Sequence, residues 1–548
     1  MNQIKTDIRT VLFGCLLLIG LPMVNAATIV ATNGTDVAVN AAIAQAKFGD
    51  TVQIPAGTWT WSVGNVGVSG ITLAGAGTNA TFILDNLPNG WGNFAGFIFG
   101  LPVPNAPTRI TGITFADAGD VVASYKGKVM IDGRAYGNAA SWRIDHCMFV
   151  NLNGNNILAY GFAVSVIDHC AFALKGAEAI TQYGLSTTPN DPWGDYPWAT
   201  PAVYGTTNVL YIEDCYFKNS ISTDAAGGAF DAEAGAMSVF RNNLLLDCAW
   251  FNHGNDTSGR YRSTRSFEIY NNVFIDDQNW VSAMDFRGGT GVVFSNTVTG
   301  YKLFDTIENY RNVQPNSFGG VDGSNPWDNT NAVVYYTGTN TTTGGSITCP
   351  GANWTPHQWA GYVVSDPAAG TIAVGHGAGS VNYCLIQDNS SDTLTMSPAK
   401  DFQIVFTNQD VFNIYYVAAA LDQVGRGSGD LIQDVTVGNW PNSVTYTIDT
   451  ATGTNSWPHQ VVEPLYSWGN TLNGSPAGIL SGYANIQEGR DIFANAVKPG
   501  YSPLPYPHPM VAAAVLAASS NSSSATNSAV TNTVPVLTPP SSLSVSPN

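Results

Sequence analysis

The sequence predicts an all-β protein, a right-handed parallel β-helix with an N-terminal helical cap and one β-rich insertion. The first observation behind this prediction is a repeat, since Asp145-His146-Cys147 returns 23 residues later as Asp168-His169-Cys170. The second is a column of Cys and Asn residues that continues the same frame. The third is the entry segment 36–61, which has the pattern of an amphipathic helix, a Gly-Asp turn and a strand. A unit of about 23 residues suits three short strands and three turns per coil.

The recurring turn residue extends well beyond the first two copies. Coils of a β-helix stack about 4.8 Å apart, so residues at equivalent positions form ladders along the axis. Asn at a tight turn can hydrogen-bond the backbone of the next coil. The residues predicted to share this column are Cys147, Cys170, Cys215, Asn243, Asn272, Asn296 and Asn470.

The two Asp-His pairs of the repeat fall in this turn, and we interpret them as structural. A metal site would need more converging ligands than stacked copies offer. Later coils replace the pair with Arg241-Asn242 and Tyr270-Asn271. The turn cysteines are expected to be buried thiols, because in-register stacking gives poor disulfide geometry.

Residues 1–26 have the features of a secretory signal peptide. A weakly basic start precedes an apolar run, and Val24-Asn25-Ala26 supplies the small-residue cleavage pattern. We expect a secreted protein, extracellular or periplasmic, that is cleaved near Ala26 and has no lipid or membrane anchor. After cleavage, a helix within residues 36–61 can cap the first open coil.

The chain is acidic, with a formal net charge of −18 at pH 7. Removing residues 1–26 takes away two basic side chains and one acidic one, which leaves 19 basic, 38 acidic and a net charge of −19. This balance argues against nucleic acid as a partner, because phosphate binding needs a basic face. We expect a soluble monomer.

Several stretches resemble known proteins. The GDTV and IPAG segments after the predicted helix, together with the IDHC coils, resemble the pectate-lyase-like superfamily of right-handed parallel β-helices. GRYRSTRSFEIYNNVF, LDQVGRG and EPLYSWGNTLNG are similar to a group of secreted bacterial β-helix proteins of largely unassigned activity. The resemblance runs from about residue 28 to 510. It implies the fold and no single chemistry, because the superfamily hosts lyases, hydrolases, epimerases and adhesins.

The spacing of the ladder also predicts the organisation of the chain. Asn296 and Asn470 are 174 residues apart, which is too far for a loop. Strand-like runs such as NAVVYYTG and DFQIVFTN fill the gap, and Cys349 and Cys384 within it could pair with each other. The C-terminal Ser, Thr, Pro and Ala tail cannot bury a core and is predicted to be disordered. The predicted segments are a signal peptide (1–26), the first part of the β-helix (27–312), an insertion (313–462), the closing part (463–510) and the tail (511–548).

Polar residues alternate with apolar ones in successive coils. In GAFDAEAG, Asp231 and Glu233 occupy the outward positions, and in SAMDFRGG these positions hold Asp285 and Arg287. In AWFNHGND we expect Phe251 to point inward. Trp250 and Asn252 are then predicted to face outward and bind substrate.

Basic residues are scarce but cluster here, with seven of the 19 in residues 241–311. The segment HGNDTSGRYRSTR adds His253, Asp256, Arg260, Arg262 and Arg265. Arginine suits bidentate recognition of carboxylates, so this face could hold an acidic sugar. Alternatively, these residues fasten loops to the coils through salt bridges.

The segment TPNDPWGDYPW, residues 188–198, carries three aromatic residues between two coils. Aromatic faces on an exposed loop can stack on sugar rings, and the alternative is a loop tucked against the coil. The residues proposed to contact substrate from this loop are Trp193, Tyr196 and Trp198.

Two reactions suit these side chains. In β-elimination, Ca²⁺ held by Asp231, Glu233 and Asp285 would neutralise a uronate carboxylate. Arg265, Arg287 or His253 would then remove the C5 proton. In hydrolysis, Asp231 and Asp285 would lie two coils apart, about 10 Å, which fits an inverting acid–base pair. The residues predicted to be catalytic are Arg287, Arg265, His253, Asp231 and Asp285, and Arg262 is predicted to bind substrate.

Known motif sets add little to this choice. GHG at residues 375–377 resembles a polygalacturonase motif but lies in the insertion, and the pectate lyase Arg-x-Pro-x-x-Arg pattern has no clear match. The sequence therefore predicts a secreted carbohydrate-active protein, foremost a lyase of a uronate-containing polysaccharide with calcium as a possible cofactor. An inverting glycoside hydrolase and a non-enzymatic, glycan-binding adhesin are the alternatives.

Overall fold

The computed structural model of the chain covers the predicted β-helix and most of the insertion. It describes residues 26–64, 66–87, 96–118, 128–152, 154–175, 178–219, 228–254, 261–308, 321–324, 334–365, 372–373, 380–381, 383–396, 406–433, 437–441, 443–445 and 459–512. The predicted signal peptide up to residue 25, the tail beyond residue 512 and the GHG segment lie outside the described residues. No helix in the described part of the chain is long and apolar enough to cross a membrane.

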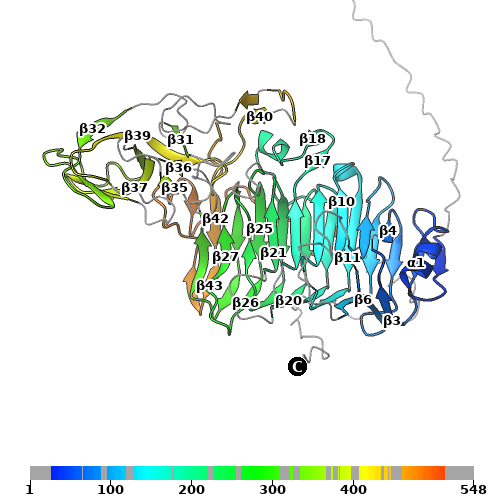
Figure 1. Cartoon of the computed structure of the whole chain (residues 1–548). Helices are drawn as coiled ribbons and strands as arrows, with labels where there is room; N and C mark the ends of the chain where they lie inside the picture. The colour runs from blue at the N-terminus through cyan, green and yellow to red at the C-terminus, as the bar shows by residue number, and fades with distance from the viewer. Residues whose placement is uncertain are drawn as a thin grey trace, which may run out of the picture.

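Three long sheets, almost entirely parallel, run along the molecule and form a parallel β-helix (Figure 1). Along the chain, strands pass from the twelve-stranded to the eleven-stranded and then to the nine-stranded sheet, so that each complete coil adds one strand to each. Consecutive coils pair in register, for example Asp145 with Asp168. The predicted fold class is confirmed.

The strands of the three sheets are short, as the repeat length requires. The twelve-stranded sheet holds β1 (Thr28–Val30), β2 (Thr51–Gln53), β5 (Thr72–Ala74), β8 (Thr108–Thr111), β11 (Ser141–Asp145), β14 (Val164–Asp168), β19 (Leu210–Glu213), β22 (Met237–Arg241), β25 (Ser266–Tyr270), β28 (Thr290–Phe294), β42 (Leu465–Trp468) and β45 (Ile492–Phe493). The nine-stranded sheet holds β4 (Val66–Val68), β7 (Ile98–Gly100), β10 (Val129–Gly133), β13 (Ile157–Gly161), β16 (Ile180–Tyr183), β21 (Phe230–Glu233), β24 (Trp250–Phe251), β27 (Ser282–Phe286) and β30 (Leu303–Ile307). The eleven-stranded sheet holds β3 (Gly57–Trp61), β6 (Thr81–Asp85), β9 (Thr114–Asp117), β12 (Met148–Val150), β15 (Ala171–Leu174), β20 (Tyr216–Asn219), β23 (Leu244–Leu246), β26 (Val273–Ile275), β29 (Thr297–Thr299), β43 (Asn470–Leu472) and β44 (Ser475–Ala477).

The helix α1 (Asp36–Ile43) lies at the N-terminal end of the β-helix (Figure 1). Thr35 caps it by accepting a hydrogen bond from the Ala38 backbone N–H at 3.3 Å. Val39 and Ala42 are buried in the same core as the first coils. The helix therefore covers the apolar end of the solenoid, as the entry segment predicts.

The predicted ladder lies at the turn between the twelve-stranded and eleven-stranded sheets. Asn272 shows how it works, because its Nδ2 donates to the Phe240 carbonyl at 2.9 Å and to Asn296 Oδ1 at 3.0 Å. Its Oδ1 accepts the Asn243 backbone N–H at 2.9 Å. The strand registers on either side of the turn keep all seven positions in one column, running from Cys147 to Asn470.

The Asp-His pairs of the repeat belong to this turn, as predicted. His146 and His169 have positive φ angles of 49° and 52°, and their rings stack at 5.0 Å. Both Nε and Nη2 of Arg109 donate to Asp145 at 2.6 Å, and Arg143 binds Asp168 in the same way at 2.7 Å. Each carboxylate is therefore used to fasten one coil to its neighbour.

The insertion forms an antiparallel sheet of its own at the end of the solenoid opposite α1 (Figure 1). Its core is a separate hydrophobic cluster that includes Trp354 and Trp359. Cys349 and Cys384 are both buried free thiols, so the suggested disulfide is wrong. The reason is that each sulfur packs in this core, with Cys349 Sγ 3.4 Å from Tyr336 Oη.

The strands of the insertion's sheet are β31 (Val321–Ser324), β32 (Tyr336–Thr339), β33 (Ser346–Thr348), β34 (Tyr362–Ser365), β37 (Tyr383–Asn389), β38 (Thr393–Met396) and β39 (Val411–Ala420). Small two-stranded sheets pair β17 (Ser186–Thr187) with β18 (Asn190–Asp191), β35 (Ile372–Ala373) with β36 (Ser380–Val381), and β40 (Leu431–Gln433) with β41 (Ser443–Thr445).

The described C-terminal residues continue the closing part back along the outside of the twelve-stranded sheet. Tyr501 Oη donates to Glu268 at 2.6 Å, and the His508 backbone N–H donates to Glu213 at 2.9 Å. The Arg241 guanidinium donates to the Leu504 carbonyl at 2.7 Å. This strap covers the outer face of β19, β22 and β25 in that sheet.

Candidate functional site

The outer face of the nine-stranded sheet holds the first pair of predicted site residues. In β21, Phe230 and Ala232 belong to the hydrophobic core. Asp231 and Glu233 alternate with them and lie on the outer face, as predicted. Their strand lies in the middle of this sheet, next to β16 and β24.

The second pair lies two coils further along the same face. In β27, Met284 and Phe286 are fully buried in the core, whereas Asp285 is half-buried on the other side. Arg287 follows directly after the strand and forms ion pairs on that side. The alternation of SAMDFRGG therefore places Asp285 and Arg287 correctly.

His253 joins the two pairs, because it follows β24, the strand between β21 and β27. Its backbone N–H donates to the Ala232 carbonyl at 2.8 Å, and its Nδ1 lies 2.9 Å from Asp231 Oδ1. Burial lowers the pKa of His253, but the adjacent Asp231 carboxylate, together with Glu233, outweighs burial and raises the pKa to about 9. At neutral pH this imidazole therefore carries a positive charge, and its side chain is 23% exposed.

Arg287 is the second cation of the candidate site. Its Nε lies 2.9 Å from Glu308 Oε2 and 3.3 Å from Asp285 Oδ2, and the side chain is 17% exposed. Burial raises the pKa of Asp285 to about 6, and the Glu308 charge adds to this shift while Arg287 opposes it. Thr306 also donates to Asp285, at 3.1 Å. Asp285 and Glu308 thus form a carboxyl pair around one guanidinium group.

The sequence interpretation missed two tyrosines on the outer face of the nine-stranded sheet, Tyr160 and Tyr183. The register places Tyr160 opposite Tyr183 and Tyr183 opposite Glu233, and the two phenol rings stack at 5.1 Å. Burial and the Glu233 carboxylate, which accepts a hydrogen bond from Tyr183, raise the pKa of Tyr183 well above its usual range. The signal was present, because LAYG and TQYG repeat at the same 23-residue spacing as the turn.

Trp193 is the residue of the 188–198 loop that borders this face. Its ring lies 5.3 Å from that of Tyr261, which in turn lies 6.0 Å from Tyr183. The Trp193 carbonyl accepts the Arg262 backbone N–H at 2.9 Å, which fixes the loop over the sheet. The suggestion that this loop forms a wall of the site agrees with the position of Trp193.

The side-chain directions predicted for Trp250 and Asn252 in AWFNHGND are wrong. Trp250 is fully buried in the core, with its ring 5.9 Å from Phe230 and 5.4 Å from Phe286. Asn252 is also buried, and its side chain bonds the backbone of Arg287 and Gly288 at 2.8 and 2.9 Å. Neither residue faces a substrate, because the two-residue strand β24 turns Trp250 inward. Asn252 instead holds the backbone that carries Arg287.

Arg262 and Arg265 are structural rather than substrate-binding or catalytic. Both side chains are fully buried. Arg262 donates twice to Asp422 at 2.7 Å and once to Asp195 at 3.1 Å, and Arg265 binds Glu463 at 2.9 Å. These bonds hold Arg262 between carboxylates of the loop and of the chain after β39, and Arg265 also donates to the carbonyls of Pro197 and Thr200 at 3.0 and 2.7 Å.

Trp198 is buried between these two arginines, with their guanidinium carbons 4.9 and 5.0 Å from its ring. Its predicted role in sugar stacking is therefore wrong, because no face of the indole is open. Tyr196 is 48% exposed and packs near Trp440, with the two rings tilted and their centroids 5.8 Å apart. Asp256 and Arg260 lie outside the described residues.

The carboxylates proposed to hold calcium are engaged with other partners. Asp231 is paired with His253, and Asp285 is paired with Arg287 and Thr306. Within the described ranges, no group of three or more His, Cys, Asp or Glu side chains is placed to hold a metal ion. The observed arrangement does not fit a calcium site, and calcium remains a prediction for experiment.

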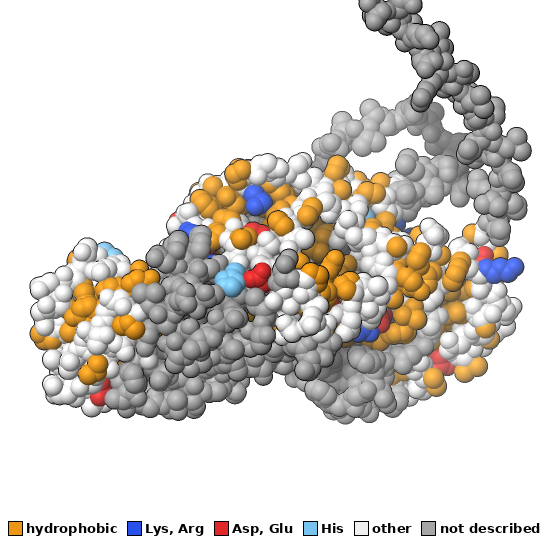
Figure 2. Space-filling view, turned by 90° about the horizontal axis from the view of Figure 1, so that it is seen from above, with side chains coloured by type: hydrophobic (Ala, Val, Ile, Leu, Met, Phe, Trp, Pro, Cys, Tyr) orange, Lys and Arg blue, Asp and Glu red, His pale blue; other side chains and the backbone are white. Residues whose placement is uncertain are grey.

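The surface on the side of β18 and β40 is poor in charge (Figure 2). Figure 2 views the molecule from the side of β18 and β40, and the described side chains there are mostly hydrophobic or uncharged, with few and scattered charges. A cluster of five carboxyl groups and two cations lies around β16, β21, β24, β27 and β30 on this sheet face, which also carries the Asp132–Arg134 ion pair beside Tyr160. Its members are Glu178, Asp231, Glu233, Asp285 and Glu308 with His253 and Arg287.

Comparisons with known proteins extend only to solved structures. No protein-family model and no curated protein sequence matches the chain. An alginate lyase from a Paenibacillus strain is 15% identical over 49% of this chain and 94% of that chain, with a TM-score of 0.30. The catalytic domain of a GH87 α-1,3-glucanase is 14% identical over 51% of this chain and 59% of that chain, with a TM-score of 0.25. The A-module of an Azotobacter vinelandii mannuronan C-5 epimerase is 16% identical over 50% and 94%, with a TM-score of 0.23. Likenesses this low assign no activity.

Proposed function

We propose that the protein is a carbohydrate-active enzyme, a polysaccharide lyase that cleaves a uronate-containing chain by β-elimination on the outer face of the nine-stranded sheet. The observation that carries the proposal is the placement of two cations, His253 and Arg287, beside the hydrogen-bonded pair Tyr183 and Glu233. A lyase needs both components, a positive charge for the substrate carboxylate and groups that move a proton.

The proposed reaction divides these roles. His253 and Arg287 bind the uronate carboxylate and stabilise the negative charge that develops when C5 loses its proton. Glu233 takes the C5 proton, and the C4–O4 bond then breaks. Tyr183 gives its proton to the departing O4 and recovers one from Glu233. Tyr183 is protonated at neutral pH, as a proton donor must be, because burial and the Glu233 carboxylate keep its pKa above the usual range of a phenol.

The carboxyl pair also favours a second candidate, an inverting glycoside hydrolase. Burial raises the pKa of Asp285 to about 6, which is suitable for a general acid. Asp231 lies two coils away, about 10 Å by coil spacing, which leaves room for a water molecule. In this alternative the substrate does not need a carboxylate group.

One assay separates these reactions. The purified protein is incubated with polyuronates and neutral polysaccharides, each with and without a calcium chelator. A lyase produces the ultraviolet absorbance of an unsaturated uronate, whereas a hydrolase produces reducing ends without that absorbance. Glycan binding with neither product would contradict both and support an adhesin. Loss of activity on chelation would support the calcium prediction.

A further inference from the structure

One inward-facing position of the nine-stranded sheet breaks a rule that all other coils obey. Met284 in β27 pairs with Asp305 in β30, and both point toward the axis of the solenoid. In every earlier strand of this sheet the same column holds a fully buried apolar residue. These residues are Val66, Ile98, Val129, Ile157, Ile180, Phe230, Trp250 and Met284.

The Asp305 carboxyl group is incompletely satisfied. Its Oδ2 atom is buried and has no hydrogen-bond partner in the part of the chain that the structure describes. Burial raises the pKa of Asp305 to about 8, although a backbone hydrogen bond from Leu480 lowers it. A buried polar atom left in this state costs free energy, so its retention calls for an explanation.

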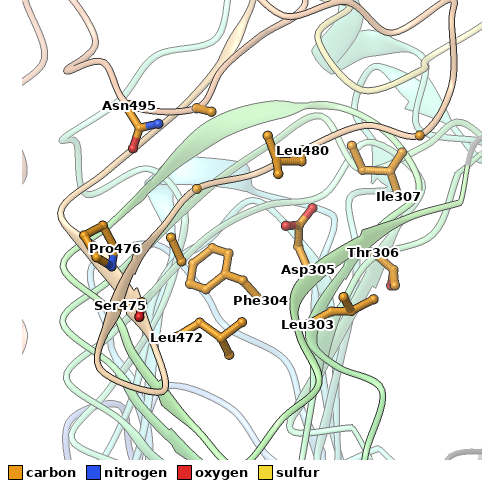
Figure 3. Close-up of a pocket in the computed structure, with 14 residues that line it drawn as sticks. Leu303, Phe304, Asp305, Thr306, Ile307, Leu472, Ser475, Pro476, Leu480 and Asn495 are labelled. Atoms are coloured by element: carbon orange, nitrogen blue, oxygen red, sulfur yellow. The ribbon is translucent and has the colours of Figure 1, made fainter.

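The carboxyl group lines a cavity of about 660 Å³ at the C-terminal end of the solenoid. Figure 3 shows Asp305 rising from β30 toward Leu480, with Phe304 beside it and Pro476 on the opposite wall. The walls are mainly apolar, and the hairpin of β43 and β44 closes one side. The volume falls within the usual range of small-molecule sites, which are mostly apolar with a few polar groups.

We propose that this end cavity binds an organic cation with an apolar body, whose ammonium group donates to the unpaired oxygen of Asp305. Charge complementarity selects this class of ligand, because one carboxylate among apolar walls favours a cation whose remaining surface is hydrocarbon. The cavity is distinct from the proposed lyase site, since Asp305 faces the interior and the lyase residues face outward, although the Asp285 charge contributes to the raised pKa of Asp305.

The probe is hexylammonium, compared with hexanol and hexanoate by titration calorimetry on the whole protein at pH 7. Hexylammonium is expected to bind at least about tenfold more tightly than hexanol, while hexanoate does not bind. Because the ammonium ion favours the ionised carboxyl group, binding should release protons below pH 8. Titrations in two buffers with different ionisation enthalpies measure this release.

Asp305→Asn should remove the preference for the cation, and Asp305→Leu, which restores the apolar column, should retain only the weak binding of hexanol. The exposed Asp277→Asn variant is the matched control and should behave as the wild type. Equal affinity for hexanol and hexylammonium, an unchanged preference in Asp305→Asn, or no saturable binding at all would overturn the proposal. Asp305 would then be only a polar end to the solenoid core.

Discussion

Arg262 and Arg287 lie 25 residues apart in the sequence, and the structure gives them opposite surroundings. Arg262 is fully buried, with two bonds to Asp422 and one to Asp195. Arg287 follows β27 on the outer face of the nine-stranded sheet, where Asp231 and Glu233 are buried, and it is paired with two carboxyl groups but still 17% exposed. Both arginines sit among carboxylates, so charge clustering alone does not distinguish a structural arginine from a candidate functional one. The two arginines differ in their access to solvent and in the sequence distance of their partners.

The largest expected effect is the loss of protein stability when the buried Arg262 is replaced. Arg262→Ala leaves the Asp195 and Asp422 carboxylates buried without their cation, so we expect a loss of about 3–5 kcal/mol in unfolding free energy. Urea unfolding followed by tryptophan fluorescence measures this loss. A variant within about 0.5 kcal/mol of the wild type would show that Arg262 is not structural.

Arg287→Ala should affect activity rather than stability. If it stabilises charge in the transition state, turnover should fall by about 100-fold or more, while the unfolding free energy changes by about 1 kcal/mol or less because the ion pairs are partly solvated. Initial rates and urea unfolding measure the two quantities separately. Lys302→Ala, an exposed cation on a neighbouring turn, is the control. Large destabilisation with unchanged specific activity would show that Arg287 is a structural residue like Arg262.

His253 should give the site a distinctive pH dependence. Its folded-state pKa is raised to about 9, so the stabilisation from pairing with Asp231 is fully present below the unfolded value near 6.5 and is lost as pH rises through 9. Because the side chain is partly exposed, this amounts to about 1–2 kcal/mol. kcat/KM should decline above pH 9 for the same reason. His253→Gln should abolish that alkaline limb, and an unchanged profile would contradict the role.

The smallest expected effect distinguishes Trp193 from Tyr196, the two aromatic residues of the 188–198 loop that are not fully buried. Trp193 borders the candidate site through Tyr261, whereas Tyr196 packs near Trp440. Trp193→Ala should raise KM by about 2–10-fold through lost stacking, and Tyr196→Ala should leave it unchanged. Steady-state kinetics on the preferred polysaccharide measure both. Equal effects would mean that the loop contacts substrate along its whole length.

Much of the candidate site could be predicted from the sequence where period-two alternation is regular. FDAE and SAMDF place Asp231, Glu233 and Asp285 on the outer face because their neighbours are unambiguous core residues. The same rule failed for Trp250. β24 has only two residues and is followed by the buried Asn252. The local pattern therefore does not show which of its side chains face the core.

The sequence by itself determined the solenoid and its turn ladder. Both follow from a repeat of about 23 residues and from side-chain alternation, which are set by local backbone geometry. Only the tertiary structure decided the roles of the arginines. The partners of Arg262 and Arg265 are Asp422 and Glu463, which lie 160 and 198 residues away along the chain. No local pattern encodes such a contact, because it exists only when the chain after β39 folds back onto the coils.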